Sequence, residues 1–284
     1  MDDELVARVR AASDRLSRAE RRVAESVVAD PRAVAFGTVA DLAQRSGASG
    51  ASVVRLAAKL GFDGFTEMQA IVQRDLARRL RPATERIRSP APGDVLAETM
   101  HAALDAVEQS LRAIDRPTFD RVVAALAEPD RNVWTIAGNA SGGIVSQFAT
   151  HLAMLRPGVR SLRGDPVSVA RSLAEVDPGD VVVALDLARY DAWVADSVER
   201  CVARGAEVVA LTDSPLSPIA SGATSLVLVE ANTVGPFDSY VGALAALDAV
   251  LAGVARAMGD AAVERLDAIE SSWSSTQALT ADDG

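Results

Sequence analysis

The chain has 284 residues, of which 49% are hydrophobic and 24% charged. This is the composition of a soluble globular protein long enough for two domains. No uninterrupted apolar run approaches the ~18–20 residues of a membrane span. The acidic segment Met1–Glu4 does not resemble a signal peptide. Cys201 is the only cysteine, which excludes an internal disulfide and a cysteine-rich zinc site. We therefore expect a cytoplasmic protein without a membrane partner.

The net charge of −10 is divided unevenly along the chain. Residues 1–88 contain 16 Lys and Arg against 12 Asp and Glu, a balance of +4, whereas residues 89–284 contain 13 against 27, a balance of −14. Such an asymmetry allows one end of the chain to approach a phosphate backbone that the other end repels. Many domains that do not bind nucleic acid carry a charge of +4, so this balance only permits DNA binding.

The first predicted helix begins with a capping box, in which the Ser17 hydroxyl and the Glu20 carboxylate each bond the other's backbone N–H. Pro31 ends this helix near Asp30. Three more helices are predicted at about 38–47, 49–61 and 66–81. Residues 82–93 contain three prolines and a glycine among polar residues, which is typical of a linker.

Beyond the linker the pattern becomes one of short β-rich runs separated by helix-length stretches. Val181–Leu185 is apolar without alternation, as expected of a strand covered on both faces. The alternation predicts βαβ units and a parallel sheet. The predicted strands are 132–137, 159–162, 180–185, 207–212 and 225–229, with helices at about 94–114, 117–127, 239–258 and 260–272.

Residues 46–49, Ser-Gly-Ala-Ser, join two short predicted helices in the manner of a helix-turn-helix motif. On the second of these helices Ser52, Arg55 and Lys59 fall within an arc of about 60° that suits a major groove. Arg55 can bond guanine and Lys59 a phosphate, although a helical domain with a solvated polar face would look the same. The predicted DNA-binding residues are Ser49, Gly50, Ala51, Ser52, Arg55 and Lys59.

Three segments, Leu16–Ala24, Val39–Ala43 and Ser52–Phe65, resemble the RpiR family of bacterial regulators in sequence and order. The resemblance implies that the third helix is the recognition helix. It also implies a sugar isomerase (SIS) domain after the linker, with a flavodoxin-like five-stranded parallel sheet that binds ligands at the carboxyl ends of its strands. We therefore expect an all-α helix-turn-helix domain at 1–81, a linker at 82–93 and an α/β ligand-sensing domain at 94–284.

Three loops of the expected SIS domain carry candidate ligand contacts. One of them, 213–220, resembles the Ser-Pro-Leu-Ala segment after the fourth SIS strand and is read mainly as a structural turn, with Ser214 as a candidate lining residue of the pocket. In 138–143 (Gly-Asn-Ala-Ser-Gly-Gly), Gly138 and Ser141 match the glycine and serine of the family's first loop, although an ordinary glycine-rich turn capped by Ser141 is the alternative. After the third strand the family's Ser-x-Ser-Gly-x-Thr phosphate cradle is replaced by 186–191, Asp-Leu-Ala-Arg-Tyr-Asp. Its aspartates repel phosphate, while Arg189 either grips an anion or pairs with one of them. The predicted ligand-binding residues are Gly138, Asn139, Ser141, Asp186, Arg189, Tyr190 and Ser214.

Catalysis is the main competing function, because some SIS domains are aldose–ketose isomerases. That reaction needs a placed base. We read His101 and His151 as surface or partly buried histidines, and Glu230, which follows the last predicted strand, is the remaining residue that could reach a pocket. We expect no catalytic residue, cofactor or metal. The predicted partners are a double-stranded operator, bound by a homodimer or a dimer of dimers, and a small effector, either a carbohydrate derivative or another anionic metabolite. A sugar-phosphate isomerase or a ligand-free scaffold is the alternative.

Overall fold

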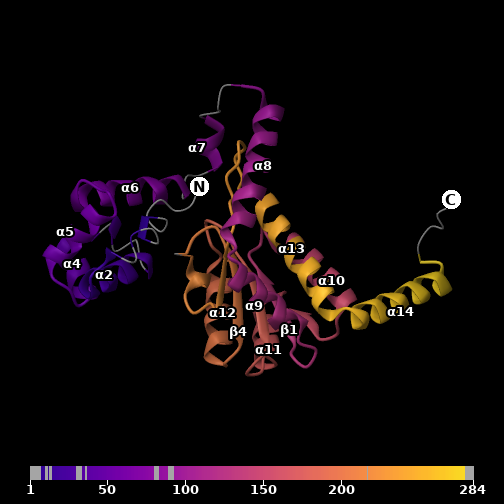
Figure 1. Ribbon diagram of the computed structural model, residues 1–284. Coiled ribbons are helices and arrows are strands. Elements are labelled where there is room, and N and C mark those ends of the chain that lie inside the picture. Colours follow the sequence, from indigo (N-terminus) through magenta and orange to yellow (C-terminus); the bar gives the residue numbers. More distant parts are fainter. Residues whose placement is uncertain are drawn as a thin grey trace.

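The computed structural model divides the chain into an N-terminal helical domain and an α/β domain, each with its own hydrophobic core (Figure 1). It describes residues 8–9, 12, 15–29, 34–35, 37–79, 83–88, 93–215 and 217–278. Part of the predicted linker, 82 and 89–92, lies outside these ranges.

The N-terminal domain is built from the four helices expected from its capping signals. They are α2 (Arg18–Ala29), α4 (Val39–Arg45), α5 (Gly50–Lys59) and α6 (Gly64–Arg79). The Ser17–Glu20 box forms as predicted, and a second box joins Thr38 to Asp41. α6 begins two residues before the predicted start, because the Glu67 carboxylate accepts the Asp63 backbone N–H and caps the helix there.

The turn between α4 and α5 sets the angle of the two helices. Gly47 has a φ of +58°, a conformation that favours glycine. Ser49 caps α5 by accepting the Ser52 backbone N–H at 3.3 Å. The Arg22 guanidinium braces the turn by donating to the carbonyl oxygens of Ser46 at 3.2 Å and Gly47 at 2.9 Å. α5 is thus fixed from both α4 and α2.

The predicted linker contains a helix that the sequence did not reveal, α7 (Ala83–Arg88). Arg86 on α7 forms an ion pair with Asp238 of the α/β domain, with 2.8 Å between Nη1 and Oδ1. The predicted linker is therefore helical over these six residues. The pairing residue is 152 positions away, so local sequence gives no sign of it.

The α/β domain has the five-stranded parallel sheet that the sequence predicted. Two helices, α8 (Val95–Ala113) and α9 (Arg116–Ala127), precede it. The strands are β1 (Val133–Ala137), β2 (Val159–Ser161), β3 (Val181–Leu185), β4 (Glu207–Thr212) and β5 (Ser225–Leu228). Their order is β2-β1-β3-β4-β5 with every neighbouring pair parallel, which is the flavodoxin-like order. The expected fold class is confirmed.

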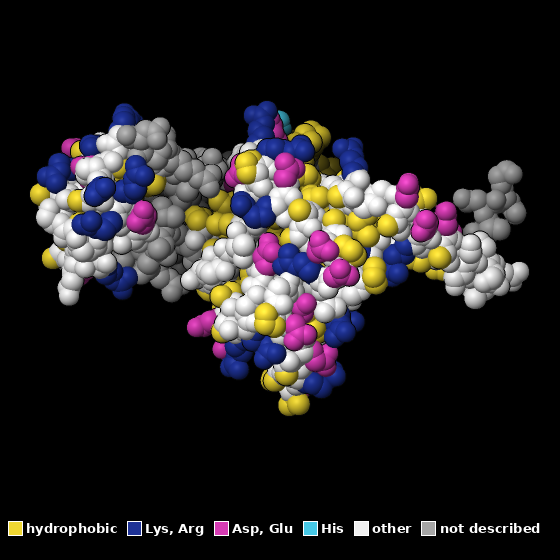
Figure 2. Space-filling model, turned by 60° about the horizontal axis from the view of Figure 1, so that its bottom comes forward, with side chains coloured by type: hydrophobic (Ala, Val, Ile, Leu, Met, Phe, Trp, Pro, Cys, Tyr) yellow, Lys and Arg dark blue, Asp and Glu magenta, His cyan; other side chains and the backbone are white. Residues whose placement is uncertain are grey.

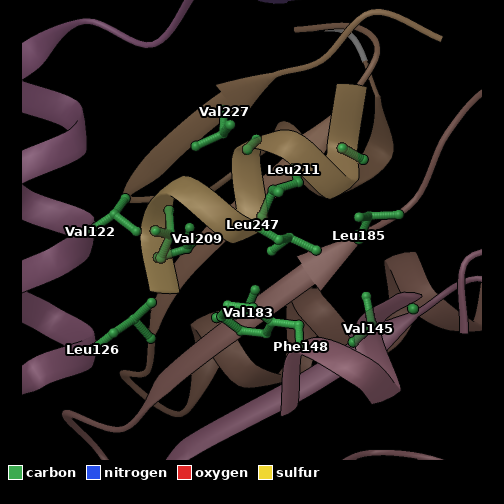
Figure 3. Packing of buried hydrophobic residues seen from close by; sticks show 14 of the residues in the cluster. Val122, Leu126, Val145, Phe148, Val183, Leu185, Val209, Leu211, Val227 and Leu247 are labelled. Atoms are coloured by element: carbon green, nitrogen blue, oxygen red, sulfur yellow. The ribbon is translucent and has the colours of Figure 1, made fainter. Parts of the chain in front are cut away.

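Helices cover both faces of this sheet. On one face α9 and α10 (Gly142–Leu155) pack with α13 (Val241–Met258), and Leu247 of α13 lies over Val183 and Leu211 (Figure 3). On the other face α11 (Pro166–Ala174) and α12 (Ala192–Ala203) cover the alternate strand residues. The final helix, α14 (Asp260–Thr276), extends away from the domain (Figure 1). A parallel sheet covered in this way leaves the carboxyl ends of its strands for a site.

α13 is the one described helix that is long and apolar enough to cross a membrane by length and composition. It packs against α8, α9 and α10 and contributes Ala243, Ala246 and Leu247 to the core. Asp248 and Arg256 interrupt its apolar sequence. Its position identifies α13 as the central helix of the α/β domain.

Candidate functional site

The exposed face of α5 is the candidate DNA-binding surface, and it is rotated from the predicted arc. Ala51, Val54, Arg55 and Ala58 are exposed, whereas Ser52 is only 2% exposed. The Ser52 hydroxyl lies 3.0 Å from the Ser49 hydroxyl, under the start of the helix. The expectation that Ser52 shares an exposed arc with Arg55 is therefore wrong. Val54, which is 45% exposed, was missed because an apolar residue gives no sequence signal for DNA contact.

Arg55 is held by contacts on one side and open on the other. Its Nη2 donates to the Ser52 hydroxyl at 3.1 Å, and its Nε lies 3.5 Å from the Glu20 carboxylate. The side chain remains 58% exposed. These contacts restrict the rotamers of Arg55 while leaving guanidinium N–H groups for a bidentate bond to a base edge.

Lys59 is bound within the domain. Its ammonium donates to Glu20 Oε2 at 2.7 Å and to the Arg15 carbonyl oxygen at 2.8 Å. The bond from Lys59, followed by that from the Ser17 backbone, lowers the pKa of the Glu20 carboxyl to about 2. Glu20 thus ties α5 to the start of α2, and the predicted contact between Lys59 and a phosphate stays a prediction.

Basic side chains gather on the N-terminal domain, at the left of Figure 2. The exposed ones on or beside α2, α4 and α5 are Arg15, Arg18, Arg21, Arg22, Arg45, Arg55 and Lys59. Their charges agree with the positive balance of residues 1–88. A surface of this charge attracts the phosphate backbone of DNA.

At the carboxyl edge of the sheet, the loops after β1 and β3 are joined by aspartate side chains. Asp191 accepts the Asn139 backbone N–H, and Asp186 accepts the Asp191 backbone N–H at 2.8 Å. A Cβ on Gly138 would collide with the Asp186 carboxylate, which explains the glycine there. The backbone N–H of Asn139, a predicted ligand-binding residue, thus already donates to Asp191.

Three carboxylates lie together at this edge, on Asp186, Asp191 and Asp213. Burial raises the pKa of Asp186 to about 6, and the charges of Asp191 and Asp213 act in the same direction against backbone hydrogen bonds that lower it. The Tyr190 hydroxyl donates to Asp213 Oδ1 at 2.9 Å. The arrangement presents mainly acceptor oxygens, which suit a ligand rich in hydroxyl donors.

The other predicted ligand residues differ in accessibility. Ser141 and Ser214 are buried, and the Ser141 hydroxyl lies 3.1 Å from the carbonyl oxygens of both Gly138 and Leu185. It therefore closes the loop against β3 and makes no side-chain cap of α10. Arg189 is exposed and has a φ of +70°, an unusual conformation outside glycine that often accompanies function.

Sequence reasoning missed Asp238 and Tyr240, which precede α13 near this edge. Burial raises the pKa of Tyr240 to about 12, and the charges of Asp238, Asp186, Asp191 and Asp213 add to the effect. Asp238 is the partner of Arg86 on α7. The segment before α13 therefore contacts the linker helix on one side and approaches the carboxylates on the other.

The described residues include few groups suited to catalysis. His101 and His151 are exposed on α8 and α10. Burial raises the pKa of the Cys201 thiol to about 11, so it is protonated at neutral pH. Among the residues that the structure describes, no three His, Cys, Asp or Glu side chains are grouped to hold a metal ion.

Comparison with known proteins agrees with this architecture. Residues 4–79 match a helix-turn-helix domain of the rpiR family, and residues 126–253 match a SIS domain. The chain is 24% identical over 221 residues to an uncharacterized HTH-type transcriptional regulator of Thermotoga maritima, covering 76% of this chain and 78% of that protein.

Two solved structures share the fold. The sugar isomerase domain of an RpiR transcription factor from Sphaerobacter thermophilus is 22% identical, with a TM-score of 0.58 over 63% of this chain and 99% of that one. The Vibrio vulnificus NanR protein, solved with ManNAc-6P, is also 22% identical, with a TM-score of 0.54 over 95% and 97%. The chain belongs to the rpiR family of helix-turn-helix transcriptional regulators, with a SIS domain after the DNA-binding domain.

Proposed function

We propose that the chain is a DNA-binding transcriptional regulator in which the SIS domain senses a carbohydrate derivative and alters operator affinity. The observation that carries the proposal is the recognition helix, where Arg55 is exposed and oriented by Glu20 and Ser52. Arg55 reads a guanine and Val54 contacts a thymine methyl group. Ser49, Gly50 and Ala51 bring the start of α5 close to the DNA backbone.

The proposed effector site lies at the carboxyl edge of the sheet. Asp186, Asp191 and Asp213 accept hydrogen bonds from the hydroxyl groups of a sugar, because a carboxylate is an acceptor only. Arg189 binds an anionic group of the same ligand through its guanidinium fork. The complex of the NanR neighbour with ManNAc-6P supports this ligand class.

The proposed signal passes through the linker. The Arg86–Asp238 ion pair joins α7 to the segment before α13. Tyr240 lies in that segment, and the charges of the effector-site carboxylates contribute to its raised pKa. A ligand that displaces this segment changes how α7 is held and so shifts the DNA-binding domain. The effect on operator affinity equals the ligand's preference for one arrangement over the other.

In this proposal the protein acts in the cytoplasm, on a two-fold symmetric operator bound by a homodimer or a dimer of dimers, and without catalysis of its own. Two relatives, of Thermotoga maritima and Haemophilus influenzae, are named as uncharacterized HTH-type transcriptional regulators, which supports this role. An isomerase would interconvert a phosphosugar in the absence of DNA, which is the observation that separates the two functions.

The first test is the selection of genomic DNA fragments by the purified chain at one near-physiological salt concentration, since phosphate contacts alone give non-specific binding. One enriched palindrome is expected. Arg55→Ala should then weaken binding to that site by about 1–3 kcal/mol and relax selectivity at one base pair. Arg171→Ala, an exposed arginine of the α/β domain, serves as the charge-matched control. No enriched site, or an Arg55→Ala protein with unchanged selectivity, contradicts the proposal.

A further inference from the structure

Lys59 is the only lysine of the chain, among 29 Lys and Arg residues. An arginine guanidinium stays protonated in proteins, whereas a lysine can release a proton and expose the lone pair of a primary amine. The one thiol of the chain, on Cys201, is buried in the α/β domain. Lys59 therefore gives the recognition helix α5 a nucleophilic chemistry that none of the arginines of the chain has.

The amine of Lys59 is accessible from solvent although it makes internal hydrogen bonds. Its side chain is 39% exposed, while that of Glu20, its ion-pair partner, is 3% exposed. The ammonium donates to Glu20 Oε2 and to the Arg15 carbonyl oxygen, which uses two of its three N–H groups. A reactant can therefore reach Nζ from the solvent side, at the C-terminal end of α5.

We propose that Lys59 is an acylation site and that its modification weakens operator binding, an inference that rests on the proposed DNA-binding function. The donor is an acyl phosphate, a small anion that the exposed side chains of Arg15 and Arg55 attract. The ammonium first loses a proton to water. The Nζ lone pair then forms a bond to the acyl carbon, and the C–O bond to phosphate breaks. Inorganic phosphate leaves with that electron pair, a second proton passes from nitrogen to solvent, and the product is a neutral amide.

The first consequence of acylation concerns Glu20. The bond from Lys59 is the largest of the contacts that lower the pKa of the Glu20 carboxyl from 4.5 to about 2. An amide can donate one hydrogen bond, but it carries no charge. Acylation thus leaves a buried carboxylate without its ammonium, and a buried charge without a partner is strongly destabilising. The carboxylate therefore attracts another cation.

The second consequence concerns Arg55. Its Nε already lies 3.5 Å from Glu20 Oε1, and among the described residues it is the other cation paired with this carboxylate. Once Lys59 is neutral, a bidentate ion pair between Arg55 and Glu20 compensates the buried charge. The N–H groups of Arg55 that would bond a guanine then face α2. One acylation therefore withdraws two basic side chains from the exposed face of α5.

Mass spectrometry of the full chain after treatment with acetyl phosphate tests the site. We expect acetylation of Lys59 Nζ in the folded chain. Glu20→Gln should increase its rate, because the ammonium is then released from the carboxylate, whereas Glu25→Gln, at an exposed position of α2, should leave the rate unchanged. A lysine that is acetylated in urea but not in the folded chain overturns the proposal, as does a rate that Glu20→Gln leaves unchanged.

Operator binding by the treated protein tests the consequence. Acetylated wild type should bind the selected operator at least about tenfold more weakly than untreated wild type, which corresponds to the loss of one base contact. Lys59→Arg keeps the positive charge but has no lysine to acetylate, so the treatment should not change the affinity of this variant. Reaction at the α-amino group is common to both proteins. Acetylated wild type with the affinity of the untreated protein overturns the proposal.

The two measurements separate this inference from the proposed function. A wild type that selects an operator but is not acetylated at Lys59 supports the DNA-binding function and refutes the inference. A wild type that is acetylated but selects no operator refutes the DNA-binding function, and amide exchange then tests the site alone. Acetylation should increase exchange in α5 of the wild type and not in that of Lys59→Arg, because the contact with Glu20 is lost only in the former; equal exchange overturns the inference.

Discussion

Replacing Glu20 with glutamine tests how the recognition helix is fixed. The carboxylate is buried and accepts the Lys59 ammonium at 2.7 Å and the Ser17 backbone N–H at 2.8 Å. Glutamine keeps the size and one acceptor oxygen but removes the charge. Hydrogen bonds to charged groups contribute about 1.5–3 kcal/mol each, more than neutral ones. We therefore expect Glu20→Gln to lower the free energy of unfolding of the N-terminal domain by about 2 kcal/mol at pH 7.

The free energy of unfolding lost in Glu20→Gln must become smaller as pH falls. The pKa of Glu20 is lowered in the folded chain from 4.5 to about 2, so the folded state favours the ionised carboxylate. A group of this kind stabilises the fold above its unfolded pKa and loses its contribution as pH falls through the folded pKa. The difference between wild type and Glu20→Gln is therefore largest above pH 4.5 and disappears near pH 2.

Amide hydrogen exchange of α2 and α5, compared at matched pH, measures this difference. Tryptophan fluorescence does not, because Trp134, Trp193 and Trp273 all lie in the α/β domain. Glu25→Gln, at an exposed position of α2, is the control and should change the free energy by less than about 0.5 kcal/mol. Equal protection of wild type and Glu20→Gln at pH 7, or a difference independent of pH, would refute the reasoning. Lys59→Met should show a similar loss of stability. If Lys59 also binds a phosphate, as predicted, the dependence of log operator affinity on log salt concentration becomes shallower by about 1, whereas an unchanged slope contradicts that contact.

Two further predictions concern the α/β domain. Asp186→Asn should have the same free energy of unfolding as the wild type near pH 4 and a higher one at pH 7, by roughly 1–3 kcal/mol. The reason is that the pKa of Asp186 is raised to about 6 in the folded chain, so the wild type loses stability as pH rises through that value and the carboxyl ionises. Urea unfolding followed by tryptophan fluorescence checks this, and equal stability at pH 7 contradicts it. Arg86→Ala and Asp238→Ala should each increase the rate of amide exchange in α7. The double variant should exchange no faster than either single variant, since both substitutions remove the same ion pair. Additive effects would show that the pair does not hold α7.

Most of the fold could be predicted from local sequence. The apolar runs of 181–185 and 207–212 coincide with β3 and β4 to within one residue, because strands buried on both faces have no competing helical pattern. The capping boxes at Ser17 and Thr38 place α2 and α4 for a similarly local reason. α7 could not be found in this way, because a six-residue helix has too little intrinsic stability and depends on a distant partner, Asp238.

The candidate site was less predictable because accessibility is decided by packing between elements. Spacing correctly placed Ser52, Arg55 and Lys59 on one side of a helix, but it gave no information on which part of that side α2 would cover. In the structure α2 supplies Glu20, which binds Lys59 and approaches Arg55. The open arc is therefore displaced toward Val54 and Ala58. The same carboxylate that binds the Lys59 ammonium also approaches the Arg55 guanidinium, so a buried acid of α2 restricts the orientation of both basic side chains on the exposed face of α5.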